Sequence, residues 1–211
     1  MGRRFLITGT DKGVGKTTVG CALGFAMRAR GMRVGVMKPV DTGCVEVDGK
    51  LDSPDARALA LAASSSIPLE LICPYPYSSL DHVPAHDLDE IARCFREIAA
   101  QSDTVLVEGA GTIATPISGN TDFADLASML RLEVLIVVGN CAGCVGVTTL
   151  ALERCTMRGL SVAGYILCDC DPVASSATDN EPALIRLASA PYLGRMRHRE
   201  PLAKAIVELL L

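Results

Sequence analysis

The sequence predicts an α/β protein with a mostly parallel β-sheet and helices on both faces. Two observations carry this prediction. Short apolar runs alternate with longer segments of helical periodicity along the chain, as in successive βαβ units. The first such junction, from Phe5-Leu6-Ile7 to Lys16, is a glycine-rich loop. No composition shift marks a linker and no internal repeat is visible, so we expect a single domain over residues 1–211.

Each predicted strand is a short apolar run, and each predicted helix has apolar residues on one face. We expect strands at Arg4–Thr8, Arg33–Met37, Thr104–Val107, Val134–Val138, Val162–Leu167 and, more weakly, Pro191–Gly194. We expect helices at Lys16–Arg30, Ser53–Ala63, Leu88–Gln101, Asp122–Leu130, Val145–Arg158, Glu181–Ala188 and Pro201–Leu210. In the first helix Val19, Leu23 and Met27 recur every four residues, which indicates one buried face.

Residues 9–18 read Gly-Thr-Asp-Lys-Gly-Val-Gly-Lys-Thr-Thr, a phosphate-binding loop between a strand and a helix. Glycines allow backbone N–H groups to surround an anion, and the positive end of the next helix faces it. Lys16 is placed to reach the terminal phosphates, and the Thr17 hydroxyl is placed to ligate Mg²⁺. The loop departs from the standard pattern at Thr10, where glycine is usual. The strand–loop–helix setting nevertheless predicts a P-loop NTPase fold that binds a nucleotide.

Composition and charge exclude several classes of partner. The net charge of −4 gives no support to nucleic-acid binding or to attraction by a membrane surface. No apolar run approaches the roughly 18 residues that a membrane-spanning helix needs. The chain passes almost at once into its first predicted strand, which leaves no room for a signal peptide. We therefore expect a cytoplasmic protein with a small-molecule substrate and with neither nucleic acid nor membrane as partner.

The nine cysteines raise the question of a disulfide framework or a metal site. Their odd number and the length of the chain argue against disulfides. Cys141-Ala-Gly-Cys144 and Cys168-Asp-Cys170 have spacings that a zinc site would allow. Both pairs follow apolar, strand-like runs, however, where free cysteine commonly acts as a small hydrophobic residue. We expect reduced thiols.

Polar residues that follow predicted strands are candidates for the ligand site, because ligands of open parallel sheets bind at the carboxyl ends of strands. Lys38 follows one strand and Glu108 another, and Glu108 precedes Gly109-Ala110-Gly111, where backbone can approach a ligand. A carboxylate one strand from a phosphate loop is a usual Mg²⁺-organising acid. Asp52 and Asp55 are acid candidates from a second loop, although such residues are more often helix N-caps.

The proline-broken segment Cys73–His86 has two open interpretations, a lid or dimer contact and an ordinary surface connection. His82 and His86 are four residues apart, but Pro84 argues against a helix that would bring them together on one face. A metal pair is not expected there.

Four segments in order resemble the dethiobiotin synthetase family. They are Ile7–Thr17, Met37–Gly43, Asp55–Leu59 and Val105–Gly111, and the likeness continues through Pro74-Tyr75, Thr121–Leu126, Val137–Gly139, Val162–Gly164 and Pro191–Gly194. The resemblance covers nearly the whole chain. It implies an ATP- and Mg²⁺-dependent cyclo-ligase that carboxylates 7,8-diaminononanoate with CO₂ or bicarbonate, phosphorylates the carbamate and closes a cyclic urea. It also implies a homodimer with the site at its interface.

The resemblance also assigns roles to particular residues. It implies that Lys38 and Lys16 are catalytic and that Thr17, Asp55 and Glu108 hold Mg²⁺. The nucleotide would be lined by Gly13, Val14, Gly15, Lys16, Thr17, Thr18, Asp55, Glu108, Gly109, Ala110, Gly111, Cys168, Asp169, Met196, Arg197 and His198. The substrate would be bound by Thr42, Lys12, Gly143, Cys144 and Val145.

The chain departs from the family pattern at several of these positions. Lys12 stands where a small hydroxyl residue is usual, and Thr112 replaces a glycine. Gly146 and Val147 stand where the family carries the Asn and His that receive the substrate carboxylate. Cys168 replaces an adenine-reading asparagine, which removes a two-way hydrogen-bonding partner.

Two alternatives follow from these departures. One is a related ligase that activates another carboxylate or carbamate, such as an amide-forming relative of the cobyrinate-diamide type. The other is a regulatory ATPase akin to the partition and division-site ATPases, but Lys12 lies one residue closer to Lys16 than the signature lysine of those proteins. The apolar stretch Ala203–Leu211 is interpreted as a packing helix.

Overall fold

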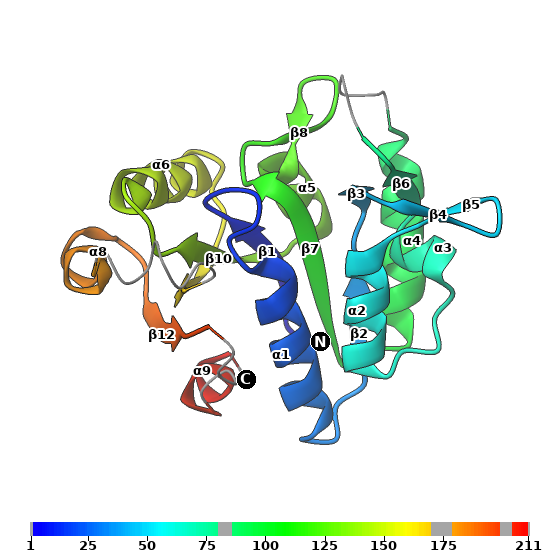
Figure 1. Ribbon diagram of the computed structural model, residues 1–211, viewed down its shortest axis with the longest axis horizontal. Helices are drawn as coiled ribbons and strands as arrows, with labels where there is room; N and C mark the ends of the chain where they lie inside the picture. Colours follow the sequence, from blue (N-terminus) through cyan, green and yellow to red (C-terminus); the bar gives the residue numbers. More distant parts are fainter. Residues whose placement is uncertain (1, 80–85, 170–178, 199–203, 211) are drawn as a thin grey trace.

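The structure is a computed structural model that describes residues 2–79, 86–169, 179–198 and 204–210. Its centre is a six-stranded sheet in the order β12-β11-β10-β1-β7-β2, in which every neighbouring pair is parallel (Figure 1). The strands are β1 Arg4–Gly9, β2 Val34–Met37, β7 Thr104–Thr112, β10 Glu133–Gly139, β11 Val162–Cys168 and β12 Tyr192–Met196. All six apolar runs chosen from the sequence form this sheet, so the predicted fold class is confirmed.

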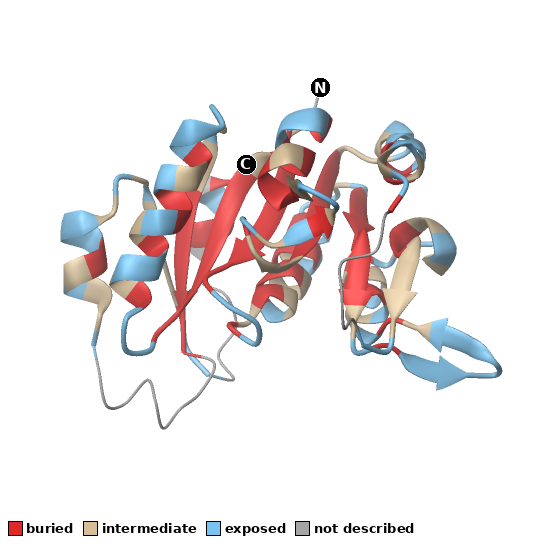
Figure 2. Cartoon of the chain, turned by 90° about the horizontal axis from the view of Figure 1, so that it is seen from above, coloured by how far each residue is buried: buried red, intermediate tan, exposed pale blue. Residues whose placement is uncertain are grey.

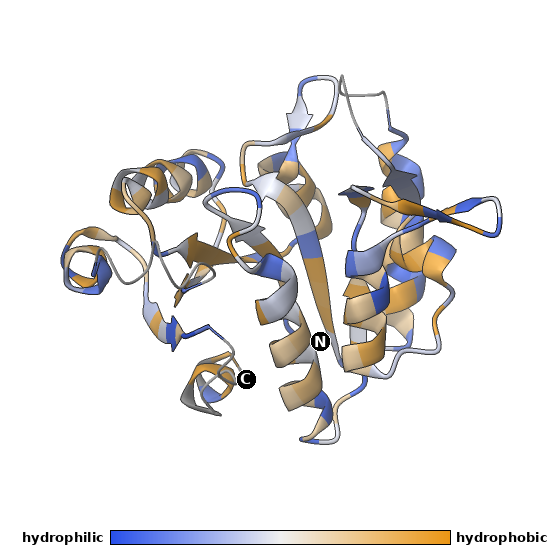
Figure 3. Cartoon of the chain, viewed as in Figure 1, coloured by the Kyte–Doolittle hydropathy of each residue, from blue (hydrophilic) through white to orange (hydrophobic). Residues whose placement is uncertain are grey.

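Helices cover both faces of the sheet. They are α1 Lys16–Arg28, α2 Pro54–Ala63, α3 Leu69–Ile72, α4 Leu88–Ala100, α5 Phe123–Leu130, α6 Cys144–Met157, α8 Glu181–Leu187 and α9 Lys204–Leu209. One buried cluster joins α1, α2 and α9 to one face, and a second joins α4, α5, α6 and α8 to the other. Strands are buried along most of their length and the helices expose their outer sides (Figure 2), while hydrophobic residues gather between the two (Figure 3).

Several boundaries differ from the sequence prediction. The first helix ends at Arg28 rather than Arg30, and α6 begins one residue early, at Cys144. Residues 201–203 of the last predicted helix lie outside the described residues. The helix α3 was not predicted, since its four residues are too short to show a period.

The predicted end of one strand was wrong by more than this. The strand β7 continues for five residues beyond Val107, to Thr112. Its first part pairs with both neighbours, Met37 opposite Val107 on one side and Ile7 opposite Glu108 on the other. After an irregularity in register, Gly9 then pairs with Thr112. Glu108 therefore lies inside a strand rather than at its end, and the extension carries Gly109–Thr112 past the end of β2.

Three short strand pairs surround the carboxyl edge of the sheet, and none was predicted. They are β3 Val40–Thr42 with β6 Tyr75–Tyr77, β4 Val45–Val47 with β5 Lys50–Asp52, and β8 Pro116–Ser118 with β9 Thr121–Asp122. In the Cys73–His86 segment, residues Tyr75–Tyr77 form β6 and pair with β3. His82 lies outside the described residues. Within the described part of the chain, no helix combines the length and apolarity needed to cross a membrane.

Candidate active site

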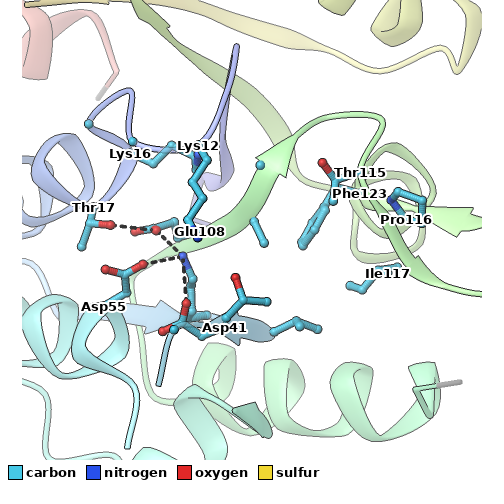
Figure 4. Close-up of a pocket in the computed structure, with 18 of the residues that line it drawn as sticks. Lys12, Lys16, Thr17, Asp41, Asp55, Glu108, Thr115, Pro116, Ile117 and Phe123 are labelled. Carbon is cyan, nitrogen blue, oxygen red and sulfur yellow. Dashed lines mark hydrogen bonds and ion pairs between the residues drawn. The ribbon is translucent and has the colours of Figure 1, made fainter. Parts of the chain in front are cut away.

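A cavity of about 830 Å³ opens at the carboxyl edge of the sheet, beside β1, β7 and β2. Its wall comes from the phosphate loop, from the segment after β2, from the start of α2 and from the extension of β7 (Figure 4). Of the residues singled out from the sequence, it is lined by Lys12, Gly13, Gly15, Lys16, Thr17, Thr18, Lys38, Thr42, Asp55, Glu108, Ala110 and Gly111. Residues far apart in the sequence thus line the same cavity.

The phosphate loop has the backbone that its glycines allow. Gly13 and Gly15 have φ of 75° and 95°, a region that side-chain-bearing residues rarely adopt, and α1 starts directly afterwards at Lys16. The Lys16 ammonium donates to the Asp11 carbonyl at 2.7 Å. Val14 does not line the cavity but is buried, and a Cβ added to Gly139 would lie 2.8 Å from its Cγ1. Val14 therefore anchors the loop on the neighbouring strand.

The unusual Thr10 also has a structural role. Its hydroxyl accepts a hydrogen bond from the Gly139 N–H at 3.2 Å, and its own N–H donates to the Val137 carbonyl at 3.0 Å. Both bonds tie the beginning of the loop to β10. A glycine at this position would lack the first of them.

Lys38 and Glu108 meet because their strands are neighbours. Met37 pairs with Val107, so the residues that follow lie side by side. The Lys38 ammonium donates to Glu108 Oε1 at 2.5 Å and to Asp55 Oδ2 at 2.8 Å, and it lies 3.8 Å from Asp41 Oδ1. Lys38 is 3% exposed and Glu108 only 1%. Three carboxylates thus surround one buried ammonium.

Burial and pairing shift the pKa values of these groups in different directions. Burial would lower the pKa of Lys38, but the charges of Glu108, Asp55 and Asp41 outweigh it and raise the pKa above its ordinary value. Burial raises the pKa of Glu108. Burial would also raise that of Asp55, but the charge and hydrogen bond of Lys38 hold it below its usual range. Burial, followed by repulsion from Lys38, lowers the pKa of Lys16.

Within the part of the chain that the structure describes, Glu108 uses only one of its two carboxylate oxygens for hydrogen bonds. Glu108 Oε1 accepts from both Lys38 and the Thr17 hydroxyl, which lies at 2.9 Å, whereas Oε2 is buried without a hydrogen bond among the described residues. Such a group is costly to bury unless something else binds it. With Asp55 and Thr17 beside it, the site offers only oxygen donors, which is the donor set that Mg²⁺ prefers.

Ser53 and Asp41 organise the loop that carries Asp55. The Ser53 hydroxyl caps α2 by accepting from the Ala56 N–H at 2.9 Å, and it donates to Asp41 Oδ2 at 2.6 Å. Asp55 then falls in the first turn of α2 and faces Lys38. Asp52 points elsewhere and pairs with Arg57 at 2.6 Å, so of the two acid candidates only Asp55 reaches the cavity.

The apolar side of the cavity was missed by the sequence analysis. It consists of Val40, Pro116, Ile117 and Phe123, with His86 beside them. Both ring nitrogens of His86 are engaged, one with the Ile117 carbonyl and the other with the Tyr77 hydroxyl at 3.0 Å. The imidazole therefore links the β6 segment to the β8 loop. Val40 and Phe123 lie in segments that resemble the family, Met37–Gly43 and Thr121–Leu126, but no role was predicted for either.

Other residues singled out from the sequence lie away from this cavity. Gly143, Cys144 and Val145 form the beginning of α6, where Gly143 has a φ of 81°. Gly109 lies in β7 against the ring of Phe123. None of these residues lines the cavity. The eight described cysteines are free, while Cys170 lies outside the described residues.

Cys168, Asp169, Met196, Arg197 and His198 gather at the ends of β11 and β12. There the buried Asp169 accepts from Asn140 at 2.8 Å and from Arg195 at 2.8 and 3.1 Å. Asn180 donates to Asn140 at 2.9 Å. These amide and guanidinium partners were also missed, because nothing in the sequence shows which strand ends become neighbours. Asn140 also contacts Cys168, because its backbone N–H donates to the Cys168 carbonyl at 2.9 Å.

Known proteins resemble the chain in sequence over nearly its whole length. A family model described as an AAA domain matches residues 3–205. The chain is 37% identical over 204 residues to the ATP-dependent dethiobiotin synthetase BioD of Aromatoleum aromaticum, and 35% identical over 205 residues to that of Xylella fastidiosa strain 9a5c. Each match covers 93% of this chain and 91% of the relative.

Solved structures resemble the chain in fold alone. The MinC:MinD cell division complex of Aquifex aeolicus matches with a TM-score of 0.59 and 14% identity, over 98% of this chain and 86% of that one. Cell division protein FtsY of Thermotoga maritima matches with a TM-score of 0.55 and 19% identity, over 100% and 68%.

Proposed function

The chain belongs to the ATP-dependent dethiobiotin synthetase family and is an ATP-dependent ligase with a P-loop fold described as an AAA domain. From this premise we propose that it joins 7,8-diaminononanoate and CO₂ into a cyclic urea. The observation that carries the proposal is the single cavity in which the phosphate loop faces Lys38, Asp55 and Glu108. A phosphoryl donor and an acceptor can meet there.

The nucleotide phosphates would be held by the backbone of residues 13–18 and by Lys16. The N–H groups at the start of α1 point toward the cavity end of the loop, and the helix dipole adds positive potential there. The extension of β7, residues 108–111, would form the opposite wall. Cys168, Asp169, Met196, Arg197 and His198 would contact the base, with Asp169 held in place by Asn140 and Arg195.

Thr17, Asp55 and Glu108 would hold Mg²⁺. The protein would supply two carboxylates and one hydroxyl, and the nucleotide phosphates and water would supply the remaining oxygen ligands. The unpartnered Oε2 of Glu108 supports this assignment. Bound Mg²⁺ supplies positive charge to the phosphoryl group that is transferred.

The reaction divides into three steps. One amine of the substrate adds to CO₂ and loses a proton, which forms a carbamate. A carbamate oxygen then attacks the γ-phosphorus, and the bond to ADP breaks. The second amine attacks the carbonyl carbon and loses its proton, the C–O bond to phosphate breaks, and the ring closes. Lys38 and Lys16 would stabilise the charge that develops during phosphoryl transfer.

Thr42 and Lys12 would contact the reacting end of the substrate. Gly143, Cys144 and Val145 would receive its carboxylate at the start of α6 of a second copy, because these residues do not line the cavity of their own chain. The functional unit would therefore be a homodimer, which we place in the cytoplasm. The apolar side chains Val40, Ile117 and Phe123 suit the methylene chain between the two ends.

A turnover assay tests the proposal. Phosphate release should require both the diamine and bicarbonate, and it should fall by about 10³-fold or more in Lys38→Ala, as for the loss of a charge that acts in the transition state. Phosphate release that ignores either substrate would contradict the function. A fully active Lys38→Ala would contradict only the role of that lysine.

A further inference from the structure

One side of the cavity is formed by a short stretch of chain outside the central sheet. Thr115 precedes β8, Pro116 and Ile117 belong to it, and Phe123 is the first residue of α5. These four side chains lie together in Figure 4, apart from the cluster around Lys38. We refer to these four residues as the β8–α5 wall. The position of this wall depends on what fixes β8 against the start of α5.

Backbone contacts join the wall to the first turn of α5. The Phe123 N–H donates to the Thr115 carbonyl at 3.3 Å, and Pro116 is the partner of Asp122 in the β8–β9 pair. The Phe123 ring also packs against β7, since a Cβ added to Gly109 would lie 3.3 Å from it. A shift in the first turn of α5 would therefore move the wall as well.

Asp122 holds this first turn in place. Its Oδ1 accepts from the Asp125 N–H at 3.0 Å, and the Asp125 carboxylate accepts from the Asp122 N–H at 3.1 Å, so the two residues form a reciprocal helix cap. The other oxygen of Asp122, Oδ2, accepts from the Arg154 guanidinium, whose Nε lies at 3.1 Å. Burial alone would raise the pKa of Asp122, but the Asp125 N–H and the Arg154 guanidinium outweigh it and hold the pKa below its ordinary value.

Arg154 reaches the cap from a different helix, α6, and does not line the cavity. Its partner Asp122 is only 5% exposed. Removing one member of such a pair leaves the other charge poorly compensated. Arg158, one turn farther along α6, pairs with Asp125 at 2.9 Å and so supports the other half of the cap. Of the two arginines, Arg154 is the one whose partner pairs directly with β8 and precedes Phe123.

We propose that Arg154 is a positioning residue for the β8–α5 wall and thereby determines the length of methylene chain that the site accepts. The inference rests on the proposed function and deepens it. The ion pair with Asp122 fixes the first turn of α5, and this turn fixes Phe123 and, through the β8–β9 pair, Pro116. These side chains bound the space that the methylene chain would fill. A well-placed apolar wall distinguishes chains that differ by one methylene by roughly tenfold or more in kcat/KM.

Hydrogen–deuterium exchange in the absence of substrate tests the positioning. Arg154→Met removes the guanidinium, and Asp122→Asn removes the charge, while asparagine remains an effective N-cap. In both variants the amides of residues 113–124 should exchange about tenfold faster than in the wild type, and those of the phosphate loop should be unchanged. Arg154→Lys keeps the charge without the planar fork, so its exchange should lie between that of the wild type and that of Arg154→Met.

Steady-state phosphate release tests the selectivity. In Arg154→Met and Asp122→Asn, the KM for the diamine should rise about tenfold. The ratio of kcat/KM for 7,8-diaminononanoate to that for its homologue with one methylene fewer should fall by about the same factor. The KM for ATP should stay within about twofold of the wild-type value. Both substitutions in one chain should have no more effect than either alone, because they remove the same pair.

Arg3→Met is the matched control. Arg3 is a similarly exposed arginine in a bidentate pair with Glu133, and neither residue lines the cavity. This variant should lower the Tm about as much as Arg154→Met does, but it should leave the exchange of residues 113–124 and all kinetic constants unchanged.

Exchange or selectivity that stays at the wild-type value in Arg154→Met would overturn the inference. Equal rises in the KM values for the diamine and ATP would overturn it too, because they would indicate a general loss of structure. A wild-type protein without diamine- and bicarbonate-dependent phosphate release would instead refute the proposed function. The exchange measurement would still decide in that case whether Arg154 holds the wall.

Discussion

The Lys38 ammonium lies 2.5 Å from Glu108 Oε1, and Glu108 is also one of the proposed ligands of Mg²⁺. Asp55 shares both relationships, at 2.8 Å from the same ammonium. The same two carboxylates would thus serve both the lysine and a metal ion, and their negative charge would be shared between the two cations. The first prediction follows from this competition.

Replacing Lys38 with methionine should strengthen metal binding while it removes catalysis. Without the ammonium, Asp55 and Glu108 repel each other and attract Mg²⁺ more strongly, so we expect the Kd for the metal to fall about tenfold, or by about 1.4 kcal/mol. Calorimetric titration with Mg²⁺ in the presence of ADP measures it. Lys38→Arg keeps the charge and should bind metal as the wild type does. Unchanged or weaker binding in Lys38→Met would show that lysine and metal do not compete.

Replacing Ser53 with alanine should destabilise the fold and disturb the metal site together. It removes the α2 cap and leaves a buried oxygen of Asp41 without its donor, which should cost about 1–2 kcal/mol in the free energy of unfolding. Urea denaturation measures this cost, and the KM for Mg²⁺ should rise because Asp55 lies in the first turn of α2. Ser66→Ala, at an exposed position, should change stability by less than about 0.5 kcal/mol. Equal stabilities of the two variants would refute the prediction.

The decrease in the free energy of unfolding at acid pH should depend in part on Asp103. The Arg33 side chain and backbone N–H bind this carboxylate and lower its pKa to about 2. Because the folded pKa lies below the unfolded value of about 3.9, the pair stabilises the fold above pH ~4. That contribution should disappear as the pH falls toward 2. Urea midpoints of the wild type and Asp103→Asn should therefore separate above pH ~4 and converge near pH ~2. Curves that stay parallel would exclude this role.

Two glycine-to-alanine substitutions should have opposite effects. At Gly35 in β2, a Cβ would lie 2.5 Å from Ser102 Oγ and 2.7 Å from Ile98 Cγ2, so overpacking should cost about 1–3 kcal/mol. At Gly146 in α6, a Cβ meets nothing within 4 Å, so alanine should stabilise the helix by about 0.5–1 kcal/mol. Thermal unfolding should show a lower Tm than wild type for Gly35→Ala and a higher Tm for Gly146→Ala. A stabilised Gly35→Ala would show that α4 can shift away from β2.

The sheet could be predicted from the sequence because its strands are buried on both faces and appear as continuous apolar runs. Val134–Val138 is such a run, and all five of its residues are buried. The hairpin Val45–Asp52 could not be predicted, since its residues are mostly exposed and its pairing depends on contacts rather than on an apolar pattern. Glu108 was assigned to a strand end because a charged residue normally ends a buried run. In this structure the strand continues past Glu108, because the buried Lys38 ammonium compensates the charge of the Glu108 carboxylate.

The part of the site that could be predicted from the residues alone is the part at the carboxyl ends of the parallel strands, where ligands of such sheets bind. Lys38 and Glu108 follow from parallel strands that share an edge. Asp55 needed the family resemblance, because nothing near it separates it from Asp52. The contacts of Asp41 with Ser53 and of His86 with Ile117 join loops whose relative positions depend on packing, so no spacing along the chain shows them.

The order of strands has a consequence for synthesis of the chain. The strand β7 lies between β1 and β2 in the sheet and pairs with both. Before β7, which begins at residue 104, has left the ribosome, β1 and β2 lack the strand that pairs with both of them. The phosphate loop and Lys38 precede β7 in the sequence and are synthesised before it. Seventy residues separate Lys38 from Glu108, so this pairing closes a long loop late. A nascent chain that has exposed Lys16 and Lys38 thus still lacks Glu108, one of the proposed metal ligands, until β7 is made. It also lacks β10, to which the phosphate loop is bonded through Thr10.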